Sequence, residues 1–169
     1  MTTIISDSQV TALKSLRPVR SYQHLSRHDV PKIAAFFGSF DFDMRRSYFG
    51  GGISDHSILQ YCRTIDWTTT DMIGRSGRYC LEALATIVAM PPDNTRAELA
   101  LACPLFCDQR QIIAELMSNV VEFASAKYRR LVVWRDLAHP DLIAELRSSE
   151  LAAFSGEEIE VKLCPTAGS

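Results

Sequence analysis

The sequence predicts a single α+β domain, built on a mixed and mostly antiparallel sheet that is flanked by helices. Two observations carry this prediction. Three strand-like segments, near 70–76, 79–90 and 95–103, are joined by short turn sequences, so adjacent antiparallel strands are expected. A long amphipathic segment follows at about 111–127, and the all-apolar run at 131–134 after it is typical of a strand covered on both faces.

The composition is that of one globular domain. The chain has 169 residues, of which 47% are hydrophobic and 22% are charged, and its net charge is −2. Because the basic residues are scattered, no nucleic-acid partner is expected, and no apolar run is long enough to predict a membrane span. The N-terminus lacks the pattern of a signal peptide and the five cysteines form no C-x-x-C pair. These features predict a cytoplasmic protein with reduced thiols, most of them buried.

Local signals place the boundaries of the domain and its first elements. Residues 1–17 are polar and weakly patterned and are expected to form an arm, so the domain is placed at 18–165. A strand is expected at about 19–25. Ser26, with Asp29 three residues later, has the pattern of a capping box and predicts the start of a helix. Three further elements are predicted: a short helix after Ser54, a helix at about 139–148 and a closing strand at about 159–163.

The segment 38–52 is predicted to be a loop. It is aromatic, charged and rich in glycine, and it ends in three consecutive glycines, so a flexible lid is expected. Its charged residues, including Arg45 and Arg46, either bind a charged substrate or face solvent.

The order of the elements and several short sequences resemble the GNAT acyltransferases. Residues 25–29 resemble the strand and x-x-D sequence that open this family's fold. Residues 45–49 and 64–67 resemble its branch of bacterial protein-lysine acetyltransferases, and Ala97-Glu98-Leu99-Ala100 is similar to the A-E-x-A central strand of that branch. The resemblance covers about 18–163 and implies the GNAT sheet, splayed at its central strand.

The resemblance implies an N-acyltransferase that moves an acyl group from acetyl-CoA or another acyl-CoA to an amine, either a small molecule or a protein lysine. It identifies Glu98 as the candidate general base, which accepts a proton from the ammonium so that the free amine can attack the thioester. Backbone N–H groups near Leu105 to Cys107 would polarise the thioester carbonyl. Without the resemblance, the residues favour an outward-facing Glu98 that pairs with Arg96 or a neighbouring lysine.

The loop that binds the acyl-CoA phosphates in this family is degenerate here. The family has Q/R-x-x-G-x-G/A, whose backbone N–H groups and helix N-terminus face the pyrophosphate. Asp108 stands at the first position, and Gln111 and Ile113 replace the glycines. Arg110 keeps a favourable charge. Ile112 and Ile113 are also explained as the start of the apolar stripe of the following helix.

The degenerate loop leaves a second hypothesis open, an inactive GNAT-like domain that binds a ligand or partner for regulation or assembly, including a homodimer. The family's tyrosine general acid has no clear counterpart, and His139 either donates a proton to the leaving thiolate or caps a helix. His24 and His28 lack a third ligand nearby, so no metal site is expected. Cys103 and Cys107 are either modifiable thiols at the splay or buried packing residues.

Overall fold

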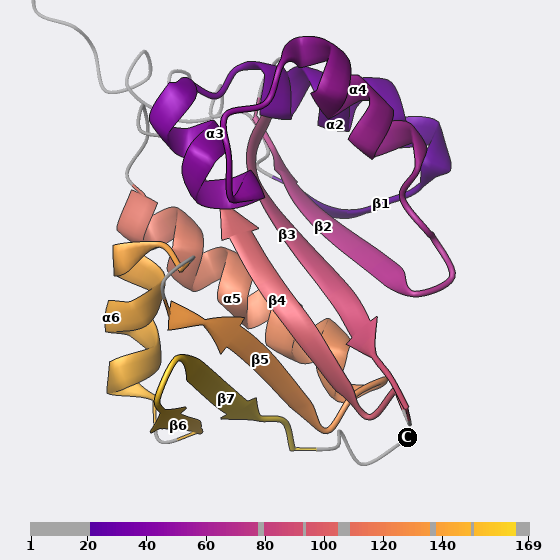
Figure 1. Ribbon diagram of the computed structural model, residues 1–169. Coiled ribbons are helices and arrows are strands. Elements are labelled where there is room, and N and C mark those ends of the chain that lie inside the picture. Colours follow the sequence, from indigo (N-terminus) through magenta and orange to yellow (C-terminus); the bar gives the residue numbers. More distant parts are fainter. Residues whose placement is uncertain are drawn as a thin grey trace, which may run out of the picture.

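One sheet forms the centre of the part of the chain that this computed structural model describes, which is residues 21–77, 80–92, 94–104, 109–135, 138–149 and 151–164. Its strands are β1 (Ser21–Leu25), β2 (Thr70–Ser76), β3 (Leu81–Met90), β4 (Arg96–Ala102), β5 (Arg130–Trp134), β6 (Ala152–Ser155) and β7 (Glu158–Lys162). They lie in the order β1-β2-β3-β4-β5-β7-β6 (Figure 1). Only β4 and β5 pair in parallel among these strands, so the predicted mixed, mostly antiparallel sheet is confirmed.

Helices cover both faces of the sheet (Figure 1). They are the 3-10 turn η1 (Arg27–Asp29) and the α-helices α2 (Val30–Gly38), α3 (Phe42–Phe49), α4 (Asp55–Arg63), α5 (Gln109–Ser125) and α6 (Pro140–Ser148). The predicted capping box is present, because Ser26 Oγ accepts from the His28 N–H at 3.3 Å and Asp29 accepts from the Ser26 N–H at 2.9 Å. Ser54 caps α4, as predicted.

Two elements differ from the prediction. The strand β6 was not predicted, because its four residues carry little pattern; it pairs with β7 through a turn at Gly156, whose φ is +58°. The predicted loop at 38–52 contains α3, so that prediction was wrong. Asp41 starts this helix by accepting from the Met44 N–H at 2.8 Å, and Gly50 ends it in the left-handed conformation with φ +72°.

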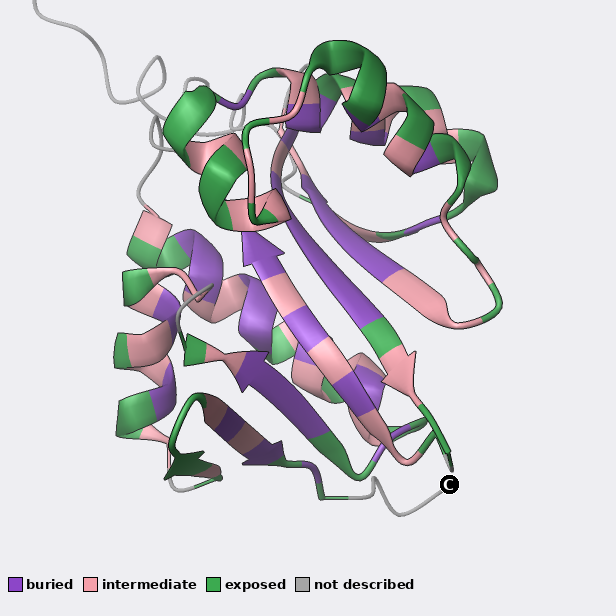
Figure 2. Cartoon of the chain, in the orientation of Figure 1, coloured by how far each residue is buried: buried purple, intermediate pink, exposed green. Residues whose placement is uncertain are grey.

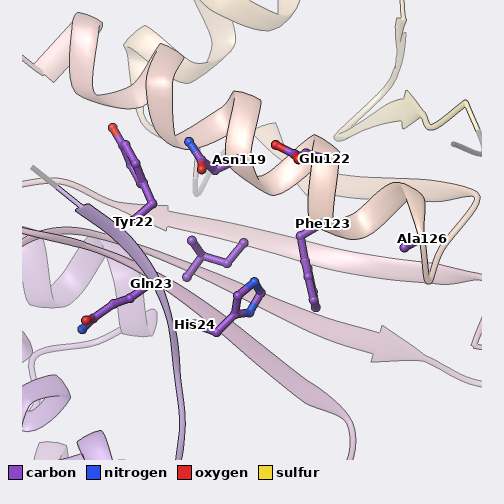
Figure 3. A pocket seen from close by; sticks show the side chains of 8 residues that line it. Tyr22, Gln23, His24, Asn119, Glu122, Phe123 and Ala126 are labelled. Carbon is purple, nitrogen blue, oxygen red and sulfur yellow. The ribbon is translucent and has the colours of Figure 1, made fainter. Parts of the chain in front are cut away.

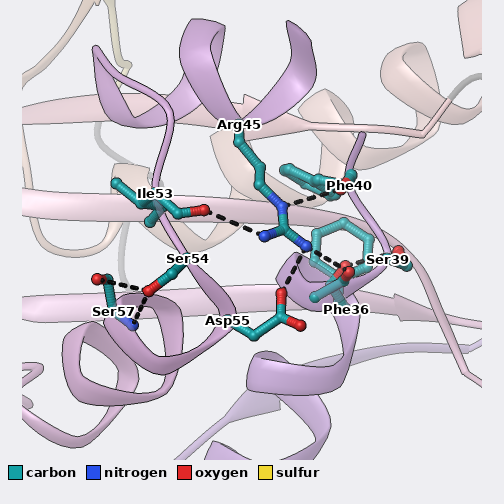
Figure 4. Close-up of polar contacts among 9 residues, drawn as sticks. Phe36, Ser39, Phe40, Arg45, Ile53, Ser54, Asp55 and Ser57 are labelled. Carbon is teal, nitrogen blue, oxygen red and sulfur yellow. Dashed lines mark hydrogen bonds and ion pairs between the residues drawn. The ribbon is translucent and has the colours of Figure 1, made fainter. Parts of the chain in front are cut away.

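Arg45 fixes α3 to the segments on either side of it (Figure 4). Its guanidinium donates to the carbonyl oxygens of Phe40 at 2.9 Å, Ile53 at 3.1 Å and Gly38 at 2.9 Å. It also lies 2.7 Å from a carboxylate oxygen of Asp55. Arg45 therefore has a structural role, and neither of the two roles predicted for it, substrate binding or simple solvation, describes it. Arg46 is exposed.

The sheet divides the core into two apolar clusters, and much of β3, β4 and β5 is buried (Figure 2). One lies under α5 and α6 and includes Ile113, Leu116 and Leu131, and the other lies under α2 and α4 and includes Phe37 and Met72. Burial of these side chains on both faces is the main stabilising contribution to the fold.

The sheet opens between β4 and β5. These strands pair only from Arg96 with Arg130 to Glu98 with Val132, although β4 continues to Ala102 and β5 to Trp134. The remaining residues of the two strands have no pairing partner across this boundary, so the strands diverge. The splay expected at the central strand is therefore present.

Candidate active site

Two small hollows lie in the opening between β4 and β5. The inner hollow, of about 60 Å³, lies beside Glu98 and is lined by Tyr48, Glu98, Leu99, Ala100, Leu101, Val133, Trp134, Ala138 and Leu142. The outer hollow, of about 80 Å³, is lined by Phe40, Met44, Ser47, Tyr48, Leu101, Ala102, Cys103 and His139. Because Tyr48 and Leu101 line both, the two hollows are neighbours along one cleft.

Glu98 is half-buried at the inner hollow. Alternation along β4 puts it on the face opposite Leu99, which lies in the cluster under α5. The expected pairing with Arg96 is not observed, because Arg96 instead lies 3.5 Å from Glu158 and 3.0 Å from Glu160. No ion pair joins Glu98 to a cation among the described residues. The carboxylate is thus available to a ligand.

Tyrosine hydroxyls lie near this carboxylate. Tyr48 is hydrogen-bonded to Thr86 at 2.9 Å, and burial raises its pKa, with smaller contributions from Tyr61 and Glu98. Burial also raises the pKa of Tyr61, and Cys62 and Glu98 add to the effect. Both hydroxyls are therefore neutral at physiological pH. Tyr48 belongs to the motif at 45–49, but it was not predicted as a site residue, because its position depends on the helix α3, which was not predicted.

His139 lies at the mouth of the cleft. Its Nδ1 accepts from the Asp141 N–H at 3.2 Å, so the helix-capping role is the one that the structure supports. Burial lowers the pKa of His139, and Asp141 partly offsets this. Since Nδ1 is an acceptor in this bond, the proton of the neutral ring is assigned to Nε2. His139 also lines the outer hollow, so a proton donor is present at this end of the site.

The N-terminus of α5 contains the described part of the predicted phosphate loop. Ile112 and Ile113 are 3% and 1% exposed and pack in the core, as an apolar stripe does. Arg110 is exposed. The Gln111 side chain donates to Glu115 at 2.8 Å, one turn further along the helix. The predicted residues Leu105, Cys107 and Asp108 lie outside the described residues.

Glu115 explains the orientation of Gln111. Besides Gln111, it accepts a hydrogen bond from the Tyr22 hydroxyl at 2.7 Å. It also lies 3.6 Å from Arg75, a fully buried guanidinium on β2 that has a second carboxylate, that of Glu82, at 3.7 Å. Gln111 therefore belongs to a polar network on the flank of α5 and turns away from the end of the helix.

A larger hollow, of about 400 Å³, lies on the α5 face of the sheet and away from the splay (Figure 3). It is bounded by β1 and α5, and the rings of His24 and Phe123 pack within it at 4.3 Å between centroids. His24 is therefore a packing residue. No group of three or more histidine, cysteine or acidic side chains is arranged as a metal site within the described ranges.

The described cysteines differ in exposure. Cys62 and Cys103 are buried, whereas Cys80 and Cys164 are exposed, so the expectation that most thiols are buried holds for only part of them. Cys103 lines the outer hollow as well as the core.

None of the described helices is long and apolar enough to cross a bilayer.

Comparison with known proteins finds similarity in structure rather than in sequence. No protein-family model and no curated protein matches the chain. The GNAT domain of PAT from S. lividans matches with a TM-score of 0.65 at 10% identity, over 85% of this chain and 89% of that one. A GNAT-superfamily phosphinothricin acetyltransferase from Sinorhizobium meliloti, solved in complex with AcCoA, matches with a TM-score of 0.64 at 14% identity, over 89% and 95%. A GNAT-family acetyltransferase from Streptococcus pneumoniae matches with a TM-score of 0.62 at 10% identity, over 86% and 99%.

Proposed function

Since the chain has the fold of the GNAT acetyltransferases, we propose that it is an N-acyltransferase that transfers an acyl group from an acyl-CoA thioester to an amine. The observation that carries this proposal is the Glu98 carboxylate, which has no described ion-pair partner and lies at the inner end of the cleft between β4 and β5. The fold alone would not suffice, because function depends on the site.

The residues present fit a phosphate-bearing donor at the outer end of the cleft. The first N–H groups of α5 have no partner within the helix, and the helix dipole favours an anion there. The side chains that replace the family's glycines point elsewhere, since Ile113 is in the core and Gln111 bonds to Glu115. We assign the phosphates to this helix end and to Arg110. When bound, the donor supplies an activated acyl carbonyl.

Glu98 prepares the acceptor in this proposal. Its carboxylate oxygen accepts a proton from the ammonium form of the amine, and the amine lone pair then attacks the acyl carbon. Apolar residues of the inner hollow, including Leu99, Val133 and Leu142, exclude water and so disfavour hydrolysis of the thioester. At the outer hollow, His139 holds a proton on Nε2, from which it can donate a hydrogen bond to the departing sulfur.

The acceptor in this proposal is a primary amine, either a small molecule or a protein lysine. Support for this class comes from the chemistry of the inner hollow, where one carboxylate and the rings of Tyr48 and Trp134 surround the space beside Glu98. A single ammonium group can be bound there by charge and by ring faces.

The test has two stages. Acetyl-CoA should raise the melting temperature of the purified protein in a saturable way, because a ligand that binds only the folded state stabilises it. Release of CoA in the presence of a panel of amines should then fall by about a hundredfold or more in Glu98→Gln, the usual effect of losing a general base. The matched control is Glu122→Gln, the same substitution at a residue lining the hollow on the α5 face.

The two stages separate the outcomes. If no acyl-CoA stabilises the protein, the transferase proposal fails and the non-catalytic binding domain becomes the better hypothesis. If acyl-CoA binds but Glu98→Gln turns over as fast as the unmodified protein, the assignment of the base is wrong.

A further inference from the structure

We propose that Tyr48 limits the length of the acyl group, so that the protein accepts short acyl thioesters such as acetyl and excludes chains of four or more carbons. This inference rests on the proposed function and concerns the wall between the two hollows. Tyr48 and Leu101 are the residues common to both linings among the described residues. Leu101 belongs to the central strand and packs under α5, whereas Tyr48 is contributed by α3.

The ring of Tyr48 is held in place from several sides. Its hydroxyl is bonded to Thr86 on β3 at 2.9 Å. Its ring packs against Phe37 and Phe49, each with 4.9 Å between centroids. The helix that carries it is fixed by the four contacts of Arg45. Tyr48 is therefore a rigid wall, in contrast to the flexible lid expected from the glycines.

Three of the residues that line the hollows with Tyr48 are alanines. Ala100 lines the inner hollow and Ala102 lines the outer one, both on β4, and Ala138 contributes another methyl group to the inner hollow. An acyl chain that lies along β4 therefore meets only methyl groups at these positions. The phenol ring of Tyr48 is the aromatic group common to both hollows among the described residues, whereas Trp134 lines only the inner hollow and Phe40 only the outer one.

The size of the inner hollow sets the limit. A space of about 60 Å³ holds roughly four to six water-sized groups, at about 10–15 Å³ each. With the thioester sulfur at the outer hollow beside His139, an acetyl group brings a carbonyl carbon, an oxygen and a methyl group to the inner hollow, and the attacking amine adds a nitrogen. These four atoms take up most of the space. Each further carbon of a longer acyl chain then has to displace a wall that is fixed.

The test is donor binding, measured by isothermal titration with acetyl-CoA and hexanoyl-CoA in the absence of any amine. The unmodified protein should bind hexanoyl-CoA about tenfold or more weakly than acetyl-CoA, a typical penalty for extra methylenes in a filled pocket. In Tyr48→Ala this ratio should fall to about two or less, because the hollows merge. Tyr48→Phe should keep the high ratio, since the ring remains and only the bond to Thr86 is lost.

Phe49→Ala is the matched control, because Phe49 packs against Tyr48 and Tyr61 but lines neither hollow. It should reduce stability and leave the ratio high. Tyr48→Leu, which keeps apolar volume on the helix, replaces Tyr48→Ala if that variant does not fold, and should also lower the ratio. The inference is overturned if the unmodified protein binds both donors equally. It is also overturned if a folded Tyr48→Ala or Tyr48→Leu variant still binds hexanoyl-CoA much more weakly than acetyl-CoA. An unmodified protein that binds neither donor overturns the proposed function itself.

Discussion

The two ends of the cleft are built from different chemistry. At the inner end, the proposed reaction needs a particular side chain, and Glu98 is present on the strand where the family resemblance places it. At the outer end, the groups proposed to bind an anion are backbone N–H groups of α5, which any residue except proline supplies. The sequence departs from the family pattern at this second end.

This difference between the two ends shows when a function strictly requires a particular sequence motif. A general base cannot be replaced without loss, whereas a helix end tolerates other residues if their side chains turn away from the ligand. Gln111 and Ile113 do so in different ways, one along the flank of the helix and the other into the core. The degenerate loop is therefore weaker evidence against donor binding than its sequence indicates.

Restoring the two glycines separately gives the largest expected effect. Ile113→Gly should destabilise the protein by about 4 kcal/mol or more, because it removes a buried side chain and adds a glycine to a helix. Gln111→Gly should cost only about 1 kcal/mol, the usual cost of glycine in a helix. Urea unfolding of both variants measures the two values. Equal losses would contradict the different locations assigned to these side chains.

Replacing Arg45 should have the next largest effect. Arg45→Met leaves three carbonyl groups without their donor and should cost about 3 kcal/mol. The control is Arg46→Met on the same helix, where the side chain is exposed and the change should stay within about 0.5 kcal/mol. Urea unfolding of the two variants measures both losses in the free energy of unfolding. A loss at Arg45 no greater than at Arg46 would show that α3 is not fixed in the way described.

Reversing the charge at the outer end should have a smaller effect. Arg110→Glu should weaken acetyl-CoA binding by about tenfold, or 1.4 kcal/mol, and the difference should shrink at high salt because the charge is exposed. Titration calorimetry at low and high salt measures it. Arg63→Glu, at the exposed end of α4, is the control and should leave the affinity unchanged. An unaltered affinity in Arg110→Glu would remove this residue from the phosphate site.

The smallest effect concerns pH and the cap of α6. Burial lowers the pKa of His139 in the folded protein below that of the unfolded chain, so the unfolded state binds more protons as the pH falls below about 6.5. Stability should therefore decrease from pH 7 to pH 5. His139→Asn keeps a capping acceptor that does not titrate, and it should reduce this decrease by no more than about 1 kcal/mol, the usual value of a cap. Urea unfolding of both proteins at pH 7 and pH 5 measures this decrease. If the free energy of unfolding falls by the same amount in the two proteins, His139 is not the group responsible.

The sequence was most informative where one signal acted locally. The bounds of β2 and the caps at Ser26 and Ser54 follow from alternation and capping patterns, and the structure confirms them. The helix α3 was missed although Asp41 and Gly50 mark its ends, because it has no buried residue to give an apolar stripe. It is held instead by Arg45 bonds to carbonyl groups of neighbouring segments. Tyr48 was missed as a site residue for the same reason, since it reaches the cleft only once that helix is in place.

The bonds of Arg45 also bear on how this fold can vary between species. Its three acceptors are carbonyl oxygens, so substitutions at positions 38, 40 and 53 leave the acceptors in place as long as the chain keeps its path. Only loss of the arginine itself would remove all three bonds at once. A wall of the proposed active site can thus persist through extensive sequence divergence, and an alignment of close homologues should show one invariant arginine among freely changing neighbours.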